Sequence, residues 1–170
     1  MIKGAWQVYA DGSGTHHADS PACVGVVIAD PSGRIVVESS SFICTGTNNV
    51  AELWALRRAL YLLRWASPDR EHTVAEVCSD SEYALGIARG EYRAKKNVDL
   101  CAELGAQAQR HAGFVVWKHV PGHAGVPGNE LADWLAGLAR QRWMLAQGRP
   151  TKPVKKRPFE GDRLWLEGPA

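Results

Sequence analysis

Two apolar runs on either side of four turn-forming residues constrain the fold of this chain more than any other feature. Residues 22–29 and 34–43 have the composition of β-strands, and the sequence Asp-Pro-Ser-Gly lies between them at 30–33. These four residue types favour a tight turn, so the two runs predict neighbouring antiparallel strands. Residues 5–10 form an earlier apolar run. The first part of the chain is therefore predicted to be a meander of three antiparallel strands.

The rest of the chain alternates between helical and strand patterns. Leucines 53, 56, 60 and 63 recur at helical spacing and predict a helix that opens after residues 45–49 and ends near Trp65. The further predicted elements are a strand over 73–79, helices over 81–89 and 98–112 (the latter capped by Asn97), a strand over 114–120, and a helix from about 129 past 139. This order, βββ-α-β-α-α-β-α, predicts a single α/β domain with a mixed sheet and helices on its faces.

The composition excludes several classes of protein. The 170 residues carry 20 basic and 18 acidic side chains, and this net charge of +2 does not by itself predict a polyanionic partner. No apolar stretch is long enough for a signal peptide or a membrane span, so no contact with a membrane is expected. The four cysteines form no Cys-x-x-Cys pair, which argues against a zinc site and for reduced thiols in a cytoplasmic protein.

Two acidic residues stand at the ends of predicted strands. Asp11 follows the first strand and precedes Gly12, which permits a sharp turn and a close approach, and Ser13, a small hydrogen-bond donor. Asp80 ends the fourth strand, which a helical crossover allows to lie parallel to the first. The two carboxylates are then expected at one rim of the sheet, where open α/β sheets place their sites.

Two more acidic residues, Glu52 and Asp133, are expected in the first turns of the first and last long helices. Each acid has an ordinary structural alternative. Asp11 is a common turn residue, and Asp80 before a helix is a common N-cap. Glu52 with Asn49 fits a capping box, and Asp133 is favoured by the helix dipole. Because all four are expected around one rim, a joint functional role explains them better than four separate coincidences.

A group of carboxylates at one rim predicts a site for divalent cations. Clustered carboxylates repel one another unless cations lie between them, and an all-oxygen set of ligands suits Mg²⁺ or Mn²⁺. Two such ions about 4 Å apart activate a water and stabilise the leaving oxygen of an in-line phosphoryl displacement. His123, in a glycine-rich loop before Asp133, is expected to carry protons to or from this site, the alternative being an ordinary exposed histidine.

Five stretches of the chain resemble the type 1 ribonuclease H family, in the family's order and across residues 5 to about 140. They are Tyr-Ala-Asp-Gly-Ser (9–13), Thr-Asn-Asn-Val-Ala-Glu-Leu (47–53), Ser-Asp-Ser-Glu-Tyr (79–83), Lys-Asn-Val-Asp-Leu (96–100) and Val-Pro-Gly-His-Ala-Gly-Val-Pro-Gly-Asn-Glu-Leu-Ala-Asp (120–133). The resemblance implies a ribonuclease H-like fold with a five-stranded mixed sheet in the order 3-2-1-4-5. It also implies a metal-dependent endonuclease that hydrolyses the RNA strand of RNA–DNA hybrids, leaving 5′-phosphate and 3′-hydroxyl ends.

The resemblance assigns roles to individual catalytic residues. The metal ligands that it implies are Asp11, Glu52, Asp80 and Asp133, with His123 as the proton-transfer group. It implies Mg²⁺ as the cofactor, with Mn²⁺ as an alternative and two ions at the site when substrate is bound. A monomer is expected.

The resemblance also implies contacts to a hybrid substrate. Thr47 is expected at a DNA phosphate, Asn48 and Asn49 in the minor groove, and Asn129 at the end of the loop or at the attacking water. The residues expected along the RNA strand, where the 2′-hydroxyl distinguishes RNA from DNA, are Gly12, Ser13 and Ser81.

Two departures from the family pattern and a terminal segment concern substrate binding. Many bacterial members carry a long basic handle before Lys-Asn-Val-Asp-Leu, whereas residues 89–96 are short here, and Glu82 adds a negative charge. After a catalytic domain of residues 1–146, residues 147–170 predict an extended tail that is basic and rich in proline. This tail is expected to grip the hybrid in place of the handle, the alternatives being a solvated tail or one that packs back on the domain through residues 164–166.

Two other functions remain as alternatives on the sequence alone. A nuclease with the same fold and another substrate, of the resolvase or transposase type, would not explain the His-Ala-Gly loop and the Thr-Asn-Asn stretch. A binding module without activity predicts the loss of at least one acid, whereas all four are present.

Overall fold

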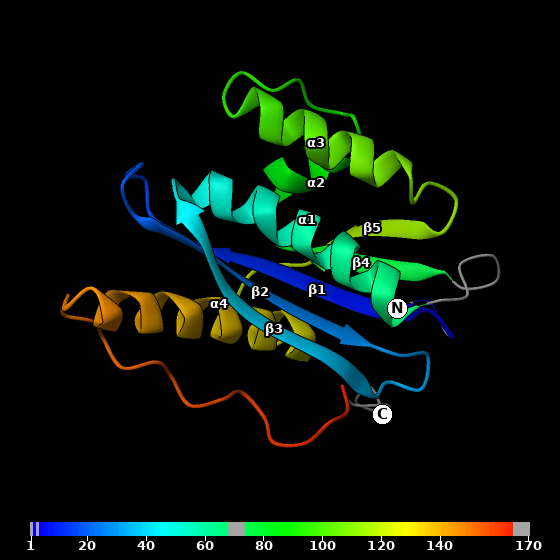
Figure 1. The fold of residues 1–170 in the computed structure, drawn as a ribbon. Coiled ribbons are helices and arrows are strands. Elements are labelled where there is room, and N and C mark those ends of the chain that lie inside the picture. The colour runs from blue at the N-terminus through cyan, green and yellow to red at the C-terminus, as the bar shows by residue number, and fades with distance from the viewer. Residues whose placement is uncertain (1, 3, 68–73, 165–170) are drawn as a thin grey trace.

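The computed structural model describes residues 2, 4–67 and 74–164, and its elements follow the predicted order. The strands are β1 (Trp6–Ser13), β2 (Pro21–Ala29), β3 (Ile35–Thr45), β4 (Ala75–Ser79) and β5 (Val115–His119). The helices are α1 (Asn48–Ala66), α2 (Glu82–Ala88), α3 (Val98–Gln109) and α4 (Pro127–Ala146). Figure 1 shows α1, α2 and α3 on one side of the sheet and α4 on the other.

The five strands form one mixed sheet in the order β3-β2-β1-β4-β5, which is the order that the family resemblance implies. β2 pairs antiparallel with β1 and with β3, while β4 pairs parallel with β1 and with β5. In the turn over 30–33, the Asp30 carboxylate accepts hydrogen bonds from the backbone N–H groups of Ser32 and Arg34 at 2.8 and 3.1 Å. Gly33 has a φ of +80°, a conformation that favours glycine.

Helices cover both faces of the sheet, and every residue of β2, an interior strand, is buried. The predicted leucine stripe of α1 is fully buried against one face; its members are Leu53, Leu56, Leu60 and Leu63. Leu131 and Leu135 of α4 form a second apolar cluster on the other face, together with Tyr9 and Val27. A sheet held between two apolar layers gives its rim a rigid frame, because protein interiors are closely packed.

Some boundaries differ from the prediction. β1 continues to Ser13 instead of ending at residue 10, because residues 11–13 still pair with β2. α4 begins at Pro127, since proline suits the first turn of a helix, where its missing N–H has no partner to lose. Asn97 precedes α3 as predicted, but it has a φ of +54° and its side chain makes no capping hydrogen bond. Residue 73, the predicted start of β4, lies outside the described residues.

All four cysteines are free thiols, and three of them are buried, in agreement with the prediction of reduced cysteines. Within the described parts of the chain, no helix combines the length and the apolar character that a bilayer crossing requires.

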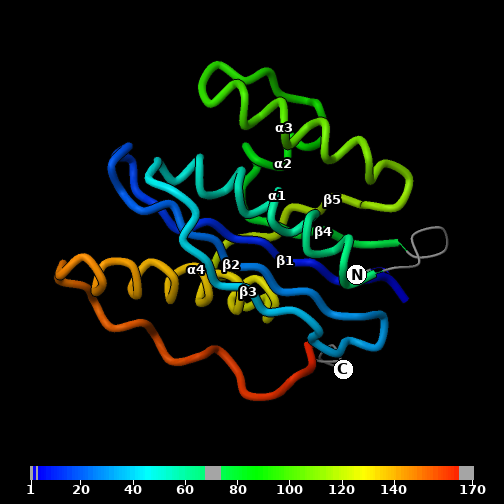
Figure 2. The backbone as a smooth tube through the Cα atoms, viewed as in Figure 1, coloured from blue at the N-terminus to red at the C-terminus, as the bar shows by residue number. Residues whose placement is uncertain are grey.

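The residues that follow α4 return along that helix in an extended form (Figures 1 and 2). Residues 149–162 contain no helix and no strand, as their prolines predict. At the far end Leu164 is buried and joins the α4 side of the core beside Phe159. The described part of the tail therefore packs on the domain. Trp165 and Leu166, predicted to share in that packing, lie outside the described residues.

Candidate active site

The parallel register of β1 and β4 places two acidic residues side by side. The last pair in this register is Tyr9 with Cys78, and two residues further along each chain are Asp11 and Asp80. Asp80 directly follows the end of β4, as predicted, whereas Asp11 lies within β1, where it still pairs with Gly25 of β2. The rim that both carboxylates share is thus set by the sheet itself.

A glycine in β1 allows α1 to bring a third acid to this rim. A Cβ atom on Gly12 would lie 2.5 Å from the backbone nitrogen of Glu52, so only glycine permits this approach. Glu52 lies in the second turn of α1 and not in the first, because the helix begins at Asn48. The capping-box alternative is therefore wrong. The Glu52 carboxylate instead accepts a hydrogen bond of 3.2 Å from the Asn48 side chain.

The carboxyl groups of Asp11, Glu52 and Asp80 offer oxygens that all lie within 4.8 Å of one another. Asp11 is 5% exposed and Glu52 is 6% exposed. Burial, followed by the charges of Glu52 and Asp80, raises the pKa of Asp11 well above its ordinary value. Burial and then the charge of Asp80 raise the pKa of Glu52 to about 8. Each acid makes it harder to ionise the others.

The donor set fits a hard divalent cation. The ligand atoms are carboxylate oxygens, which Mg²⁺ and Mn²⁺ prefer, and Oε2 of Glu52 is buried with no hydrogen-bond partner among the described residues. No lysine or arginine of the described chain forms an ion pair with Asp11, Glu52 or Asp80. A buried acidic group without a compensating cation is costly, so an external cation is the natural partner.

Asp133 and His123 border this trio. Asp133 lies in the second turn of α4 and is near enough for its charge to help raise the pKa of Asp11, although it stands outside the compact group of three. His123 lies in the loop before α4 with a φ of +53°, and its Nδ1 is 3.9 Å from Oδ2 of Asp133. The imidazole is 70% exposed, so it can exchange protons with solvent while it faces the site.

The predicted substrate-binding residues gather at the start of α1 and around the rim. Thr47 precedes α1, and its hydroxyl makes no capping hydrogen bond. Asn48 and Asn49 are exposed in the first turn, where Oδ1 of Asn48 accepts a hydrogen bond of 2.9 Å from the backbone N–H of Gly14. This bond ties the loop after β1 to the start of α1, which makes a continuous surface of the two segments.

The other predicted contact residues differ in their burial and in their hydrogen bonds to the rest of the protein. Ser13 is half-buried at the end of β1. The Ser81 hydroxyl caps α2 by accepting a hydrogen bond of 3.2 Å from the backbone N–H of Ala84. Asn129 is buried in the first turn of α4, and its Oδ1 has no partner within the described residues. Asn129 is therefore the member of this group whose polar atom most needs a further partner.

Two residues near the site were missed by sequence reasoning. A Cβ on Gly122 would lie 2.7 Å from Oδ2 of Asp80, so the loop before His123 can approach that carboxylate only with glycine there. His119, at the end of β5, has its Nε2 3.2 Å from the backbone oxygen of Asp80. The position of His119 at a parallel strand's carboxyl end could have indicated its place at the rim.

Comparisons with known proteins agree with this geometry. The chain is 42% identical over 97 residues to the ribonuclease H of Thiobacillus denitrificans, a match that covers 53% of this chain and 64% of the relative. It is 37% identical over 146 residues to the ribonuclease H of Methylorubrum extorquens, covering 79% of this chain and 59% of the relative. The chain thus spans about three fifths of the length of these curated relatives.

A solved structure shares the fold. LC11-RNase H1, isolated from compost by a metagenomic approach, has a TM-score of 0.71 and 31% identity over 83% of this chain and 99% of its own. The same relative has been solved in complex with an RNA/DNA hybrid, with a TM-score of 0.69 and 30% identity over 82% of this chain and 99% of its own. The model of the RNase H family matches residues 3–141. The chain belongs to the ribonuclease H family.

Proposed function

We propose that this protein is a divalent-cation-dependent endonuclease that hydrolyses the RNA strand of RNA–DNA hybrids, leaving 5′-phosphate and 3′-hydroxyl ends. The observation that carries the proposal is the group formed by Asp11, Glu52 and Asp80, whose oxygens lie within 4.8 Å and lack a basic partner among the described residues. Membership of the family supports the reaction, and the hybrid bound to LC11-RNase H1 supports the substrate.

The residues of the chain divide the chemical work between them. Asp11, Glu52, Asp80 and Asp133 would hold two Mg²⁺ ions, with Mn²⁺ as the alternative. When bound, these ions supply a lowered pKa for the attacking water and charge stabilisation at the leaving oxygen. The water oxygen bonds to phosphorus while the bond from phosphorus to the RNA 3′-oxygen breaks. Asp133 lies 3.9 Å from Nδ1 of His123, and the imidazole would deliver a proton to the departing 3′-oxygen while the attacking water loses its proton to solvent.

Recognition of the hybrid rests on the surface around the start of α1. We assign Thr47 to a DNA phosphate, Asn48 and Asn49 to the minor groove, and Asn129 to the attacking water or the loop before α4. The residues that we assign to the RNA strand are Gly12, Ser13 and Ser81. The exposure of both asparagines supports this assignment, since exposed amide groups can donate to and accept from base edges; the Asn48 amide already bonds Gly14 and Glu52 and keeps one donor and one acceptor site beyond these.

The organisation of the protein follows from the same site. Residues 1–146 would form the catalytic domain and residues 147–170 a basic extension of it. A single chain supplies every proposed catalytic group, so we propose that the protein acts as a monomer. Four free thiols suit the cytoplasm, where cysteines remain reduced.

A cleavage assay with matched substrates tests the proposal. An RNA–DNA hybrid, a double-stranded RNA and a double-stranded DNA of one sequence, each end-labelled, are incubated with the protein with and without Mg²⁺. Only the RNA strand of the hybrid should be cut, only with the metal, and the products should carry 5′-phosphates and 3′-hydroxyls. Cutting of double-stranded DNA instead, or of the hybrid at an equal rate in EDTA, would contradict the assignment.

A further inference from the structure

The extension after α4 is fixed to the body of the protein by its backbone and by one arginine. The indole Nε1 of Trp134 donates a hydrogen bond of 2.7 Å to the backbone oxygen of Lys155. The Gln141 side chain donates to the backbone oxygen of Lys152 at 3.3 Å. Arg157 forms a two-pronged ion pair with Glu38 of β3, with nitrogen–oxygen distances of 2.6 and 3.0 Å. None of these anchors uses a lysine side chain.

The lysines of the extension are exposed to solvent. Thr151, Val154 and Arg157 are half-buried, at a spacing of three residues, which is the period of a polyproline II helix. Lys152 and Lys155 are exposed between them, and neither side chain has an ion-pair partner in the described structure. The extension is therefore an anchored strip that presents free positive charge at fixed positions.

A groove of about 680 Å³ is lined by both α4 and this strip, and it reaches the active site. His123 and Asp133 stand at its catalytic end, Arg140 lies further along its α4 side, and Lys152 and Lys155 line its other wall. Asp133 and Arg140 are seven residues apart on one helix, or about 10 Å at the rise of an α-helix. A nucleic-acid strand that leaves the catalytic acids along α4 would thus meet positive charge within a few phosphates.

The distribution of charge gives this strip particular weight. Residues 1–140 hold 13 basic and 15 acidic side chains, whereas residues 141–170 hold seven basic and three acidic ones. Residues 1–140 therefore carry a net charge of −2 and residues 141–170 a net charge of +4, which favours contact of the final segment with a polyanion. The loop over 89–96 is a second basic segment, with four basic side chains and one acidic one, but it lies before α3 and not beside the groove along α4.

We propose that Lys152 and Lys155, held against α4 by the docked extension, bind phosphates of the RNA strand that flank the scissile bond. This proposal rests on the proposed function, because the acids at the end of the groove define where the cut phosphate lies. The contacts read the backbone and no base, so they add affinity without sequence preference. Because the strip is already docked, little ordering cost opposes the binding.

Substitution of the two lysines tests the proposal without removing the strip. In Lys152→Gln/Lys155→Gln the backbone oxygens that accept from Gln141 and Trp134 remain. The KM for hybrid should rise about tenfold near physiological salt, with kcat within about twofold of the wild type. The slope of log binding constant against log salt, measured by anisotropy without cleavage, should become shallower by about 1.4–1.8 units, since each lost phosphate contact removes about 0.7–0.9.

The matched control removes two exposed charges from another face, where Arg64 and Arg110 line a separate hollow between α1 and α3. Arg64→Gln/Arg110→Gln should leave KM and the salt slope as in the wild type. An equal rise of KM in both double variants would mean a general effect of net charge and would overturn the proposal. An unchanged KM and salt slope in Lys152→Gln/Lys155→Gln would overturn it as well.

Neutral linkages in the substrate identify the strand that is bound. Methylphosphonates placed beside the cut in the RNA strand should weaken binding to the wild type. They should have little further effect on Lys152→Gln/Lys155→Gln, because the linkage and the substitution remove the same contact between lysine and phosphate. The same linkages in the DNA strand should weaken both proteins equally; the reverse result would assign the lysines to DNA. Failure of the wild type to cut any hybrid would instead refute the proposed function, which keeps the two claims separable.

Discussion

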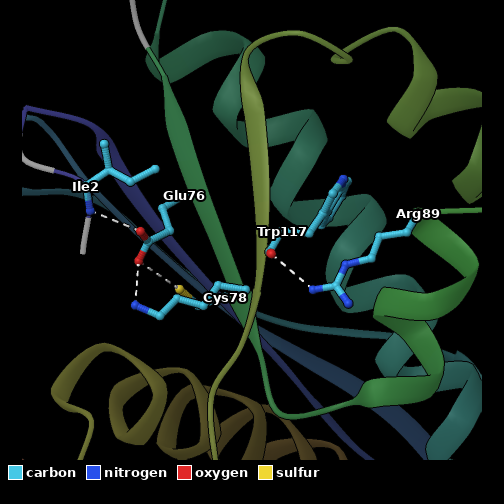
Figure 3. Close-up of polar contacts among 6 residues, drawn as sticks. Ile2, Glu76, Cys78, Arg89 and Trp117 are labelled. Carbon is cyan, nitrogen blue, oxygen red and sulfur yellow. Dashed lines mark hydrogen bonds and ion pairs between the residues drawn. The ribbon is translucent and has the colours of Figure 1, made fainter.

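Buried acidic residues occur at both ends of β4, but only those at one end have a basic partner among the described residues. Near the start of the strand, Glu76 is 3% exposed and accepts hydrogen bonds from the ammonium of Lys118 at 3.0 Å and the backbone nitrogen of Ile2 at 3.1 Å (Figure 3). Beyond the other end, Asp11 and Glu52 are buried beside Asp80, and no basic side chain of the described residues pairs with these three.

This difference distinguishes Glu76, which links neighbouring strands of the sheet, from Asp11, Glu52 and Asp80, which are available to bind a ligand. Lys118 lies on the neighbouring strand β5, and the hydrogen bond to Glu76 raises the pKa of that lysine. The Cys78 thiol, whose pKa burial raises to about 12, stays protonated and is directed at the same carboxylate at 3.9 Å. Since burying a carboxylate without a partner is costly, the uncompensated acids mark the site where a cation is expected from solution.

The largest effect should follow from removing one charge of the uncompensated group. Asp11→Asn keeps the shape of the side chain but removes a proposed metal ligand, so kcat for hybrid cleavage should fall by more than about 10³-fold. In metal-free buffer the variant should melt at a higher temperature than the wild type, because repulsion among the acids is relieved. Circular dichroism checks the fold. Substantial Mg²⁺-dependent cleavage by a folded Asp11→Asn protein would sink the assignment.

The next effect concerns the proton carrier that faces the same group. His123→Ala should lower kcat by about 10²–10⁴-fold and leave KM nearly unchanged, since a proton-transfer group acts in the chemical step and not in binding. Added imidazole should restore part of the rate. A change confined to KM, with no recovery in imidazole, would mean that His123 binds substrate.

A smaller effect is expected at Glu76, the acid that has a basic partner, and it should change the stability of the protein and not its activity. Glu76→Gln leaves Lys118 without its partner, but that ammonium reaches solvent, so the loss of stability should be about 1–2 kcal/mol. The melting temperature should fall by about 2–8 °C, while kcat and KM stay within about twofold of the wild type. If Glu76→Gln abolished cleavage without unfolding, the contrast between the two groups would be wrong.

The acids could be found in the sequence because each stands beside a strong local signal. Asp80 ends a short apolar strand and Asp11 precedes a glycine, and a parallel pairing of their strands was enough to place them together. The boundary of β1 could not be predicted, since its last residues owe their pairing to β2 and not to their own apolar pattern. The capping-box interpretation of Glu52 failed for a similar reason: the helix begins where Asn48 meets the loop after β1.

Contacts between distant segments could not be predicted from local sequence patterns. Lys118 and Glu76 are 42 residues apart, and nothing near either residue indicates that β4 and β5 align them. The extension shows the same limit. Its prolines predicted an extended form, but its docking on α4 depends on Trp134, Gln141 and Glu38, which lie in two other elements. Gly122 became informative only when the loop was seen against Asp80.

The central claim is that the buried acids form a binding site for a cation. The most direct test compares the melting temperatures of the wild type and Glu52→Gln over a range of pH, with and without Mg²⁺. The pKa of Glu52 is raised in the folded chain, from an ordinary 4.5 to about 8, so the folded state binds this proton more tightly than the unfolded state. The stability that the proton contributes is fully present below about pH 4.5 and is lost as the pH rises toward 8.

Without metal, the melting temperature of the wild type should therefore fall relative to Glu52→Gln across this range, because the glutamine has no proton to lose. Excess Mg²⁺ should cancel or reverse the fall in the wild type by taking the place of the proton, and it should stabilise Glu52→Gln less. If the difference between the two proteins does not change with pH, or if Mg²⁺ shifts both melting temperatures equally, the acids are not a cation site and the account is contradicted.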